Sequence, residues 1–228
     1  MEQEQQADGV RPTPEQTSEA ITRVLLYSGG WDSTLAGHLY PDASKLYVDL
    51  ESPYSDVEME HLPEDVKVVG LDLFQFVLPD GYHVPQRNAI LALIGAAYGM
   101  SQGAKEIEVL ICGMKEDLTA PDKNPAYFEA LGALASLFDP SGEYKITVRG
   151  FFEDDKITLW EKAGKPDVRD IISCYAGNNC GGCLACKRRV LYLDFIYPGE
   201  FEGDFAQDIK DLEGEGWIID DRIKAKHL

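Results

Sequence analysis

Short apolar runs alternate with longer amphipathic stretches between about residue 24 and residue 163. Five runs have the length and the apolar, β-favouring content of buried strands, namely 24–27, 46–50, 66–71, 107–112 and 144–148. Five stretches with helical spacing of apolar residues predict helices at 33–39, 56–62, 87–100, 125–137 and 157–163. This alternation predicts an α/β fold with a doubly wound, mostly parallel five-stranded sheet. Its ligand crevice is expected at the carboxyl ends of the strands.

The two ends of the sequence differ from this alternation. Residues 1–20 are rich in Glu, Gln and Pro and have almost nothing to bury, so we expect a disordered or loosely packed arm. Residues 196–228 are Gly-rich and acidic, with isolated apolar anchors at Phe201, Phe205 and Trp217. They are expected to form an extension on the domain that residues 21–195 build.

The first predicted strand leads directly into the segment Ser28-Gly29-Gly30-Trp31-Asp32-Ser33-Thr34. Glycines allow a tight turn, and Asp32 and Ser33 are residue types that cap a helix N-terminus. Free N–H groups at such a terminus bind anions, the hydroxyls of Ser28, Ser33 and Thr34 add donors, and Asp32 could hold a phosphate-bound Mg²⁺. The segment lacks the Gly-Lys-Ser/Thr ending of a Walker A loop. The alternative is an ordinary strand–helix turn, but the full pattern favours phosphate binding.

Four of the five cysteines lie within thirteen positions with the spacing C-x5-C-x2-C-x2-C: Cys174, Cys180, Cys183 and Cys186. Each C-x2-C pair lets two sulfurs converge on one ion. Four thiolates would fill a tetrahedral Zn²⁺ shell, so residues 174–186 predict a structural zinc knuckle. Disulfides and an iron–sulfur cluster are the alternatives. The spacing of the cysteines and the expected location in the cytoplasm, where disulfides are rare, together favour zinc. The fifth cysteine, Cys112, ends an apolar run and is expected to be a buried core thiol.

Composition limits the classes of function. The chain has 228 residues, of which 44% are hydrophobic and 27% charged, as in one soluble globular domain. No apolar run has the length of a membrane span and no signal peptide is evident, so a cytoplasmic protein without a membrane partner is expected. The net charge is −19, and the only compact basic cluster is Lys187-Arg188-Arg189. The strongly negative charge favours a small-molecule substrate over a nucleic acid. The alternative is that the acidic residues only keep the protein soluble.

Four further charged residues lie after predicted strands or at helix starts, near the expected ligand edge of the sheet. Arg87 could fork onto a phosphate or a carboxylate. Asp117 and Asp122 could bind a substrate amine or Mg²⁺, and Lys156 could neutralise charge that develops on a phosphate. Taken singly, each of these residues also fits a solvated side chain or a cap.

Together these residues resemble the 7-cyano-7-deazaguanine synthase family, the queuosine-pathway branch of the PP-loop ATP pyrophosphatases. The resemblance covers about residues 23–195. It rests on these segments: Ser28-Gly29-Gly30-x-Asp32-Ser33, Val84-Pro85-x-Arg87-Asn88, Gly113-x3-Asp117 with Pro121-Asp122 and Phe128, Lys156, and Ser173-Cys174-Tyr175 through Cys180, Cys183 and Cys186 to Arg189. The combination is far more specific than any single segment.

The resemblance implies a ligase that adenylates 7-carboxy-7-deazaguanine with ATP and adds ammonia to give an amide. A second activation then gives the nitrile 7-cyano-7-deazaguanine (preQ0). It implies that Asp32, Arg87, Lys156, Asp117 and Asp122 are catalytic, the last two near the deazaguanine or a metal. ATP, Mg²⁺ and Zn²⁺ are the implied cofactors, and a homodimer is the implied assembly. The implied ATP-binding residues are Tyr27, Ser28, Gly29, Gly30, Asp32, Ser33 and Thr34.

Two segments depart from the family pattern, and they leave alternatives open. Residues 50–55 replace the usual Tyr-Gly-Gln-Arg/Lys-His, and Lys123-Asn124 replace Cys-Arg. A homologue that stops at the amide, or passes the activated acid to another amine, therefore remains an alternative. So does a tRNA-modifying, thiolating PP-loop enzyme, for which Cys112 is the only spare cysteine. A non-catalytic nucleotide-binding module is the third class.

Overall fold

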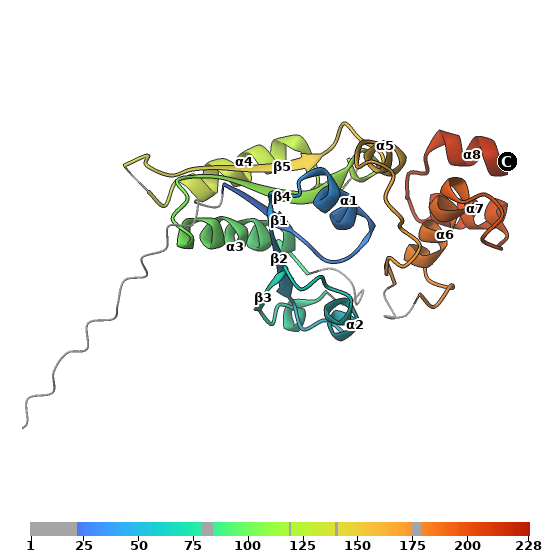
Figure 1. Ribbon diagram of the computed structural model, residues 1–228, viewed down its shortest axis with the longest axis horizontal. Helices are drawn as coiled ribbons and strands as arrows, with labels where there is room; N and C mark the ends of the chain where they lie inside the picture. The colour runs from blue at the N-terminus through green and yellow to red at the C-terminus, as the bar shows by residue number, and fades with distance from the viewer. Residues whose placement is uncertain (1–21, 79–83, 119, 140, 175–178) are drawn as a thin grey trace, which may run out of the picture.

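The computed structural model describes residues 22–78, 84–118, 120–139, 141–174 and 179–228, and one parallel sheet organises them (Figure 1). The sheet has the strand order β3-β2-β1-β4-β5, and each neighbouring pair is parallel. The strands are β1 (Arg23–Leu26), β2 (Ser44–Asp49), β3 (Lys67–Gly70), β4 (Glu106–Met114) and β5 (Lys145–Phe151). The predicted α/β fold with a five-stranded parallel sheet is confirmed.

Helices connect and cover the strands. The five predicted helices correspond to α1 through α5, and their ends differ from the prediction by at most two residues. The structure adds α6, α7 and α8, which the sequence pattern did not predict, and the short 3₁₀ turns η1 and η2. The helices and turns are α1 (Trp31–Leu39), α2 (Ser55–Glu60), η1 (Phe74–Phe76), α3 (Arg87–Ser101), η2 (Lys115–Asp117), α4 (Pro125–Ser136), α5 (Lys156–Lys162), α6 (Leu184–Ile196), α7 (Phe205–Gly214) and α8 (Asp221–His227).

The sheet separates two hydrophobic cores. Alternate residues of the central strand point to opposite faces, so Leu25 packs with α1, α5 and α6, whereas Val24 and Leu26 pack with α3 and α4. Helix α3 approaches the sheet closely because it presents glycines there. A Cβ added at Gly99 would lie 2.8 Å from Ile107 Cγ2. Only this small-residue face of α3 packs deeply, because Leu93 on the other side is 41% exposed.

Helices α6, α7 and α8 gather beyond α5 at one end of the molecule (Figure 1). Helix α7 packs on α6, and α8 contacts both. Ile209 and Ile223 are fully buried, while the predicted anchors Phe205 and Trp217 are only partly buried against the same core. The acidic segment after residue 196 therefore contributes two packed helices to the core that lies on the α1 side of the sheet.

The chain adds β2 and β3 on one side of β1 and then adds β4 and β5 on the other side. The order of the strands therefore switches sides between β1 and β4. Such a switch point opens a crevice at the carboxyl ends of the two strands. No helix in the described parts of the chain is long and apolar enough to cross a membrane. The predicted N-terminal arm, residues 1–20, lies outside the described residues.

Candidate functional site

The segment between β1 and α1 forms a tight turn closed by one hydroxyl. Gly29 has a φ of +73°, a conformation that favours glycine. The Ser33 hydroxyl donates to the Gly30 carbonyl at 3.1 Å and accepts from the Ser28 amide at 3.2 Å. The N-cap of α1 is Gly30 without a side-chain cap, so the expectation that Asp32 and Ser33 cap the helix is wrong. Ser33, in the first turn of α1, instead stabilises the glycine turn through these two hydrogen bonds.

Two predicted site residues that are far apart in the sequence meet beside this turn. The side chain of Asp155 caps α5 by accepting from the Thr158 amide at 2.8 Å. This cap sets Lys156 as the first residue of α5, where it is 7% exposed. Its ammonium forms an ion pair with Asp32 in the first turn of α1. A cation and a carboxylate thus flank the glycine turn.

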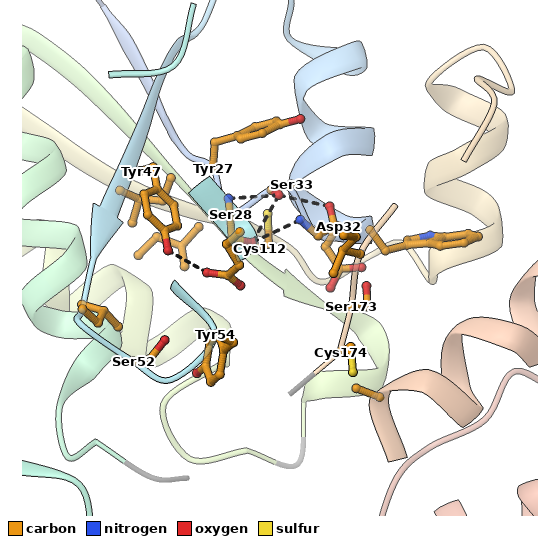
Figure 2. A pocket seen from close by; sticks show the side chains of 18 of the residues that line it. Tyr27, Ser28, Asp32, Ser33, Tyr47, Ser52, Tyr54, Cys112, Ser173 and Cys174 are labelled. Carbon is orange, nitrogen blue, oxygen red and sulfur yellow. Dashed lines mark hydrogen bonds between the residues drawn. The ribbon is translucent and has the colours of Figure 1, made fainter. Parts of the chain in front are cut away.

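A cavity of about 370 Å³ opens in front of the turn (Figure 2). It is walled by the carboxyl ends of β1, β2 and β4, by α2, by the first turns of α1 and α3, and by α6. Of the predicted nucleotide-binding and catalytic residues, those that line it are Tyr27, Ser28, Gly30, Asp32, Ser33, Arg87 and Lys156. Gly29 and Thr34 are not part of the wall. The Thr34 hydroxyl instead donates to the Gly29 carbonyl at 3.3 Å and contacts the Tyr27 hydroxyl.

Asp117 and Asp122 are not among the cavity-lining residues. Asp117 accepts from the Met114 amide at 3.1 Å and lies 3.7 Å from the Lys123 ammonium. Burial raises the pKa of Asp117, but nearby cations outweigh that effect and hold it below its usual value. The Asp122 carboxylate accepts from the side-chain amide of Asn88 at 2.8 Å, which links the loop after β4 to the start of α3. In this structure both carboxylates organise the loop that presents Lys123 to the cavity.

A second acidic side chain, which no sequence pattern indicated, also lines the cavity. Glu58 of α2 accepts from the Tyr47 hydroxyl at 2.8 Å. Burial raises the pKa of Glu58 to about 7, against the lowering effects of the Tyr47 bond and of Arg87. The wall beside it includes Ser52 and Tyr54, which belong to the segment that departs from the family pattern (Figure 2). A carboxyl group poised between its two protonation states therefore faces a largely apolar space.

Cys112 packs against the core, as expected, but it is only partly buried and also lines this cavity. It lies near the end of β4 and lines the wall close to Ser28 and Ser33 (Figure 2). Burial, followed by the negative charge of Asp32, raises the pKa of Cys112 far above its ordinary value. The thiol is therefore protonated at neutral pH and is a weak nucleophile.

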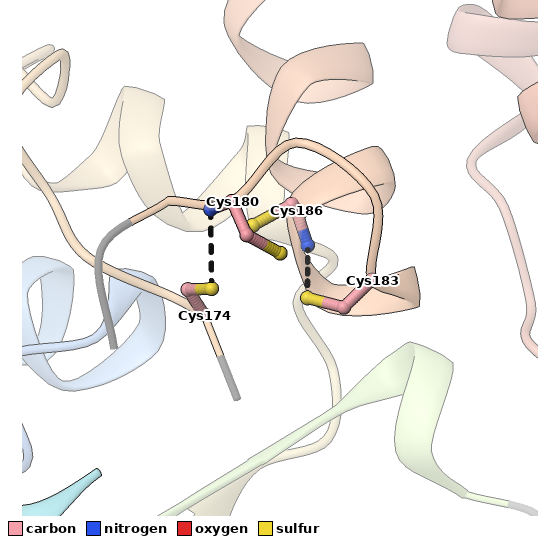
Figure 3. A group of neighbouring side chains, drawn as sticks. All are labelled: Cys174, Cys180, Cys183 and Cys186. Atoms are coloured by element: carbon pink, nitrogen blue, oxygen red, sulfur yellow. Dashed lines mark hydrogen bonds between the residues drawn. The ribbon is translucent and has the colours of Figure 1, made fainter. Parts of the chain in front are cut away.

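The four clustered cysteines converge at the start of α6 (Figure 3). Their sulfur atoms all lie within 4.8 Å of one another. A tetrahedral Zn²⁺ with bonds of about 2.3 Å needs sulfurs about 3.8 Å apart, so this set fits such an ion with small adjustments. The Cys180 amide donates to Cys174 Sγ at 3.3 Å and the Cys186 amide to Cys183 Sγ at 3.4 Å, which stabilises thiolates. Tyr175, part of the same motif, lies outside the described residues.

The cysteine cluster is not remote from the cavity. Cys174 and its neighbour Ser173 line the cavity wall, and Cys183 caps α6. A bound ion would therefore hold both this wall and the first turn of α6 in place. Because four thiolates complete the shell, no coordination position is left for a water or a substrate.

Comparison with known proteins identifies relatives. Residues 63–193 match the family model described as queuosine biosynthesis protein QueC. Similar curated proteins are each named 7-cyano-7-deazaguanine synthase. The protein from Prochlorococcus marinus is 26% identical over 74% of this chain and 91% of its own length. Those from Thermoplasma acidophilum and Thermoplasma volcanium are 30% and 29% identical, over 64% and 74% of this chain and 58% and 68% of their own lengths. No solved structure matches the chain.

Proposed function

This chain belongs to the QueC family of queuosine biosynthesis proteins, and from that premise we propose that it is a 7-cyano-7-deazaguanine synthase. The observation that carries the proposal is the family match over residues 63–193, together with relatives that bear this name. The reaction joins 7-carboxy-7-deazaguanine and ammonia. It uses ATP to convert first a carboxylate oxygen and then the amide oxygen of the substrate into good leaving groups.

The glycine turn suits the phosphates of ATP. Amides of the turn and the first turn of α1 provide N–H donors and the positive end of the helix dipole. The carboxylate of the substrate attacks the α-phosphorus, the bond to the β-phosphate oxygen breaks, and pyrophosphate leaves. Lys156 and Arg87 stabilise the charge that builds up on the transferred group. Mg²⁺, when bound, would offset phosphate charge, and Asp32 is the carboxylate that could hold it.

Ammonia then attacks the acyl carbon of the adenylate, and AMP leaves with the carboxyl oxygen to give the amide. In the second round the amide oxygen attacks ATP, pyrophosphate leaves again, and loss of AMP and of two N–H protons gives the nitrile. Apolar side chains in the cavity wall, such as Leu46, Val48 and Leu91, suit a flat heteroaromatic ring. The Glu58 carboxyl and the Tyr47 hydroxyl could hydrogen-bond to the N–H groups at the edge of such a ring.

We further propose roles for the metal site and for the parts of the chain outside the cavity. Zn²⁺ at Cys174, Cys180, Cys183 and Cys186 stabilises the fold and takes no part in the chemistry. Asp117 and Asp122 act by shaping the loop after β4. Residues 21–195 act as the ATP-binding domain, with 196–228 as its extension and 1–20 as an arm. We also propose a homodimer located in the cytoplasm, which light scattering and cell fractionation would test.

Two observations weigh against the thiolating alternative. A sulfur carrier needs a thiolate, but the pKa of Cys112 is raised by burial, so its thiol stays protonated. A tRNA-binding protein also needs a basic face, whereas this chain carries a net charge of −19. A variant reaction that ends at the amide, or with another amine, differs only in its product and is decided by the assay below.

The test is product analysis. Purified protein is incubated with ATP, Mg²⁺, ammonium and 7-carboxy-7-deazaguanine, and the deazaguanine species are identified by mass. We expect the nitrile, with AMP formed. Lys156→Met should abolish product, while Lys162→Met, an exposed lysine of the same helix, serves as the matched control. Accumulation of the amide alone would support the shorter reaction, and no ATP turnover would contradict the proposal.

A further inference from the structure

Arg188 is a buried basic residue that lines the cavity. It lies in the second turn of α6 and is 8% exposed. Its Nε is buried without a hydrogen-bond partner, and its guanidinium takes part in no hydrogen bond or ion pair among the described residues. Burial lowers the pKa of Arg188, but the nearby charges of Asp32, Asp117 and Glu116 outweigh that effect and favour the charged form. A buried guanidinium whose N–H groups lack hydrogen-bond partners points to a group that binds there.

The residues on either side of Arg188 have different environments. Lys187 forms ion pairs with Asp208 and Asp211 of α7. Arg189 donates to the Arg169 carbonyl. Of these three consecutive basic residues, Arg188 is therefore the only one that lacks such a partner within the described chain, and it lines the cavity in front of the glycine turn.

The C-terminal extension fixes the orientation of this guanidinium. Its central carbon lies 4.7 Å from the ring centroid of Trp217 and 5.9 Å from that of Tyr192. Trp217 also lines the cavity. Stacking on an indole covers a face of the guanidinium but leaves the N–H groups at its edge available, and these match the two oxygens of a carboxylate or phosphate.

The acidic side chains near Arg188 are engaged elsewhere. Asp32 pairs with Lys156, and Asp117 accepts from the Met114 amide. Glu116 accepts from the Lys156 amide and the Tyr192 hydroxyl through one oxygen, while its other oxygen is buried without a partner. Neutralising that oxygen is thus the competing role for Arg188, and the experiment must separate it from ligand binding.

We propose that Arg188, held in place by Trp217, is a further substrate-binding residue that takes an oxyanion in this cavity. The oxyanion is either the pyrophosphate part of ATP or the carboxylate of the second substrate. This inference rests on the proposed function for the identity of the two ligands. Trp217 lies beyond residues 63–193, so the family match does not include it. The C-terminal extension thereby contributes directly to the site.

The experiment measures binding, not turnover. Full-length, zinc-loaded protein is titrated calorimetrically with inorganic pyrophosphate, with 7-carboxy-7-deazaguanine and with the uncharged 7-cyano compound. Arg188→Met removes the charge and keeps the stem, Arg188→Lys keeps the charge, and Trp217→Leu removes the stacking ring. Lys187→Met is the control on the same helix. Charge-assisted hydrogen bonds predict a loss of about 10- to 100-fold in affinity for one oxyanion in Arg188→Met, with partial rescue in Arg188→Lys.

The pattern of losses identifies the ligand. Weaker pyrophosphate binding assigns Arg188 to the nucleotide. Weaker binding of the carboxy compound, with the cyano compound unchanged, assigns it to the substrate carboxylate. Trp217→Leu should weaken the same ligand by a smaller factor. Unchanged affinities in a folded but less stable Arg188→Met would overturn the inference in favour of neutralising Glu116, and so would failure of the wild type to bind either oxyanion. Wild-type protein that binds pyrophosphate through Arg188 but forms no nitrile would contradict only the proposed function.

Discussion

The ammonium of Lys156 forms an ion pair with the carboxylate of Asp32, and this contact joins the first turn of α5 to the first turn of α1. The Lys156 side chain is 9% exposed and that of Asp32 is 24% exposed. A pair this well shielded is poorly screened by solvent, so removing either partner leaves an uncompensated charge. The same contact keeps both groups at the glycine turn.

A double-mutant cycle tests this pair without any assay of activity. Lys156→Met and Asp32→Asn should each lower the free energy of unfolding by roughly 1–3 kcal/mol, because the remaining partner stays partly buried. The double variant should lose clearly less than the sum of the two. Urea denaturation measures all three differences. Strictly additive losses would show that the two side chains do not interact.

The fold was predictable because each strand contains a short cluster of β-favouring apolar residues, such as residues 24–26 in β1 and residues 46–48 in β2, and because helical patterns separate these clusters. Helix α6 was missed because Arg188 and Asp194 are buried along with Leu191 and Tyr192, which removes the contrast between faces. Helix α7 carried a readable signal. Asp204 caps it and Ile209 and Leu212 form its buried face, but the acidic composition around them obscured it.

The site was only partly predictable, for a physical reason. Asp32 and Arg87 sit at strand ends and helix starts, where chain order alone indicates the ligand edge of the sheet. Glu58 lines the cavity beside Tyr47, whose hydroxyl donates to it, and the fold brings these two residues together. Trp217 reaches the cavity from the far end of the chain. Contacts of these two kinds depend on tertiary packing, and no local pattern encodes them.

Glu58 should make stability depend on pH. Its pKa is raised by burial from 4.5 to about 7, although the Tyr47 bond and Arg87 oppose the rise and Asp49 adds to it. The protonated form is therefore favoured by folding. The associated stability is fully present below pH 4.5 and is lost as the pH rises through about 7.

Glu58→Gln should remove this dependence. Between pH 5 and pH 8 the wild type should lose free energy of unfolding relative to the variant, on the order of 3 kcal/mol or less. Urea denaturation at several pH values gives the difference. Glu60→Gln, an exposed residue of the same helix, is the control. Parallel curves for wild type and Glu58→Gln would mean that the Glu58 carboxyl titrates normally.

Metal analysis should find one zinc ion per chain, and its removal should destabilise the protein. Chelation releases Cys183, which caps α6, and Cys174, which lines the cavity. A loss of about 3 kcal/mol would lower Tm by roughly 6–12 °C in a chain of this size. Cys183→Ser should reproduce the effect, with Cys112→Ser as the control outside the cluster. Stoichiometric iron with visible absorbance would contradict the zinc assignment.

Close packing between α3 and β4 makes Gly99 sensitive to a single methyl group. Gly99→Ala would place a Cβ 2.8 Å from Ile107 Cγ2 and 3.1 Å from its Cγ1, so we expect a loss of about 1–3 kcal/mol of stability. Gly214→Ala at the end of α7 is the matched control, because no atom lies within 4 Å of the added carbon. It should be neutral or stabilising by up to about 1 kcal/mol. Equal effects of the two changes would contradict the close approach.

The most direct test of the account is a crystal structure of the zinc-loaded protein with a non-hydrolysable ATP analogue. We predict that the phosphates contact backbone amides in the first turn of α1, with Lys156 and Arg87 within hydrogen-bond distance of phosphate oxygens. A structure in which this turn is empty and the nucleotide is bound elsewhere would contradict the account.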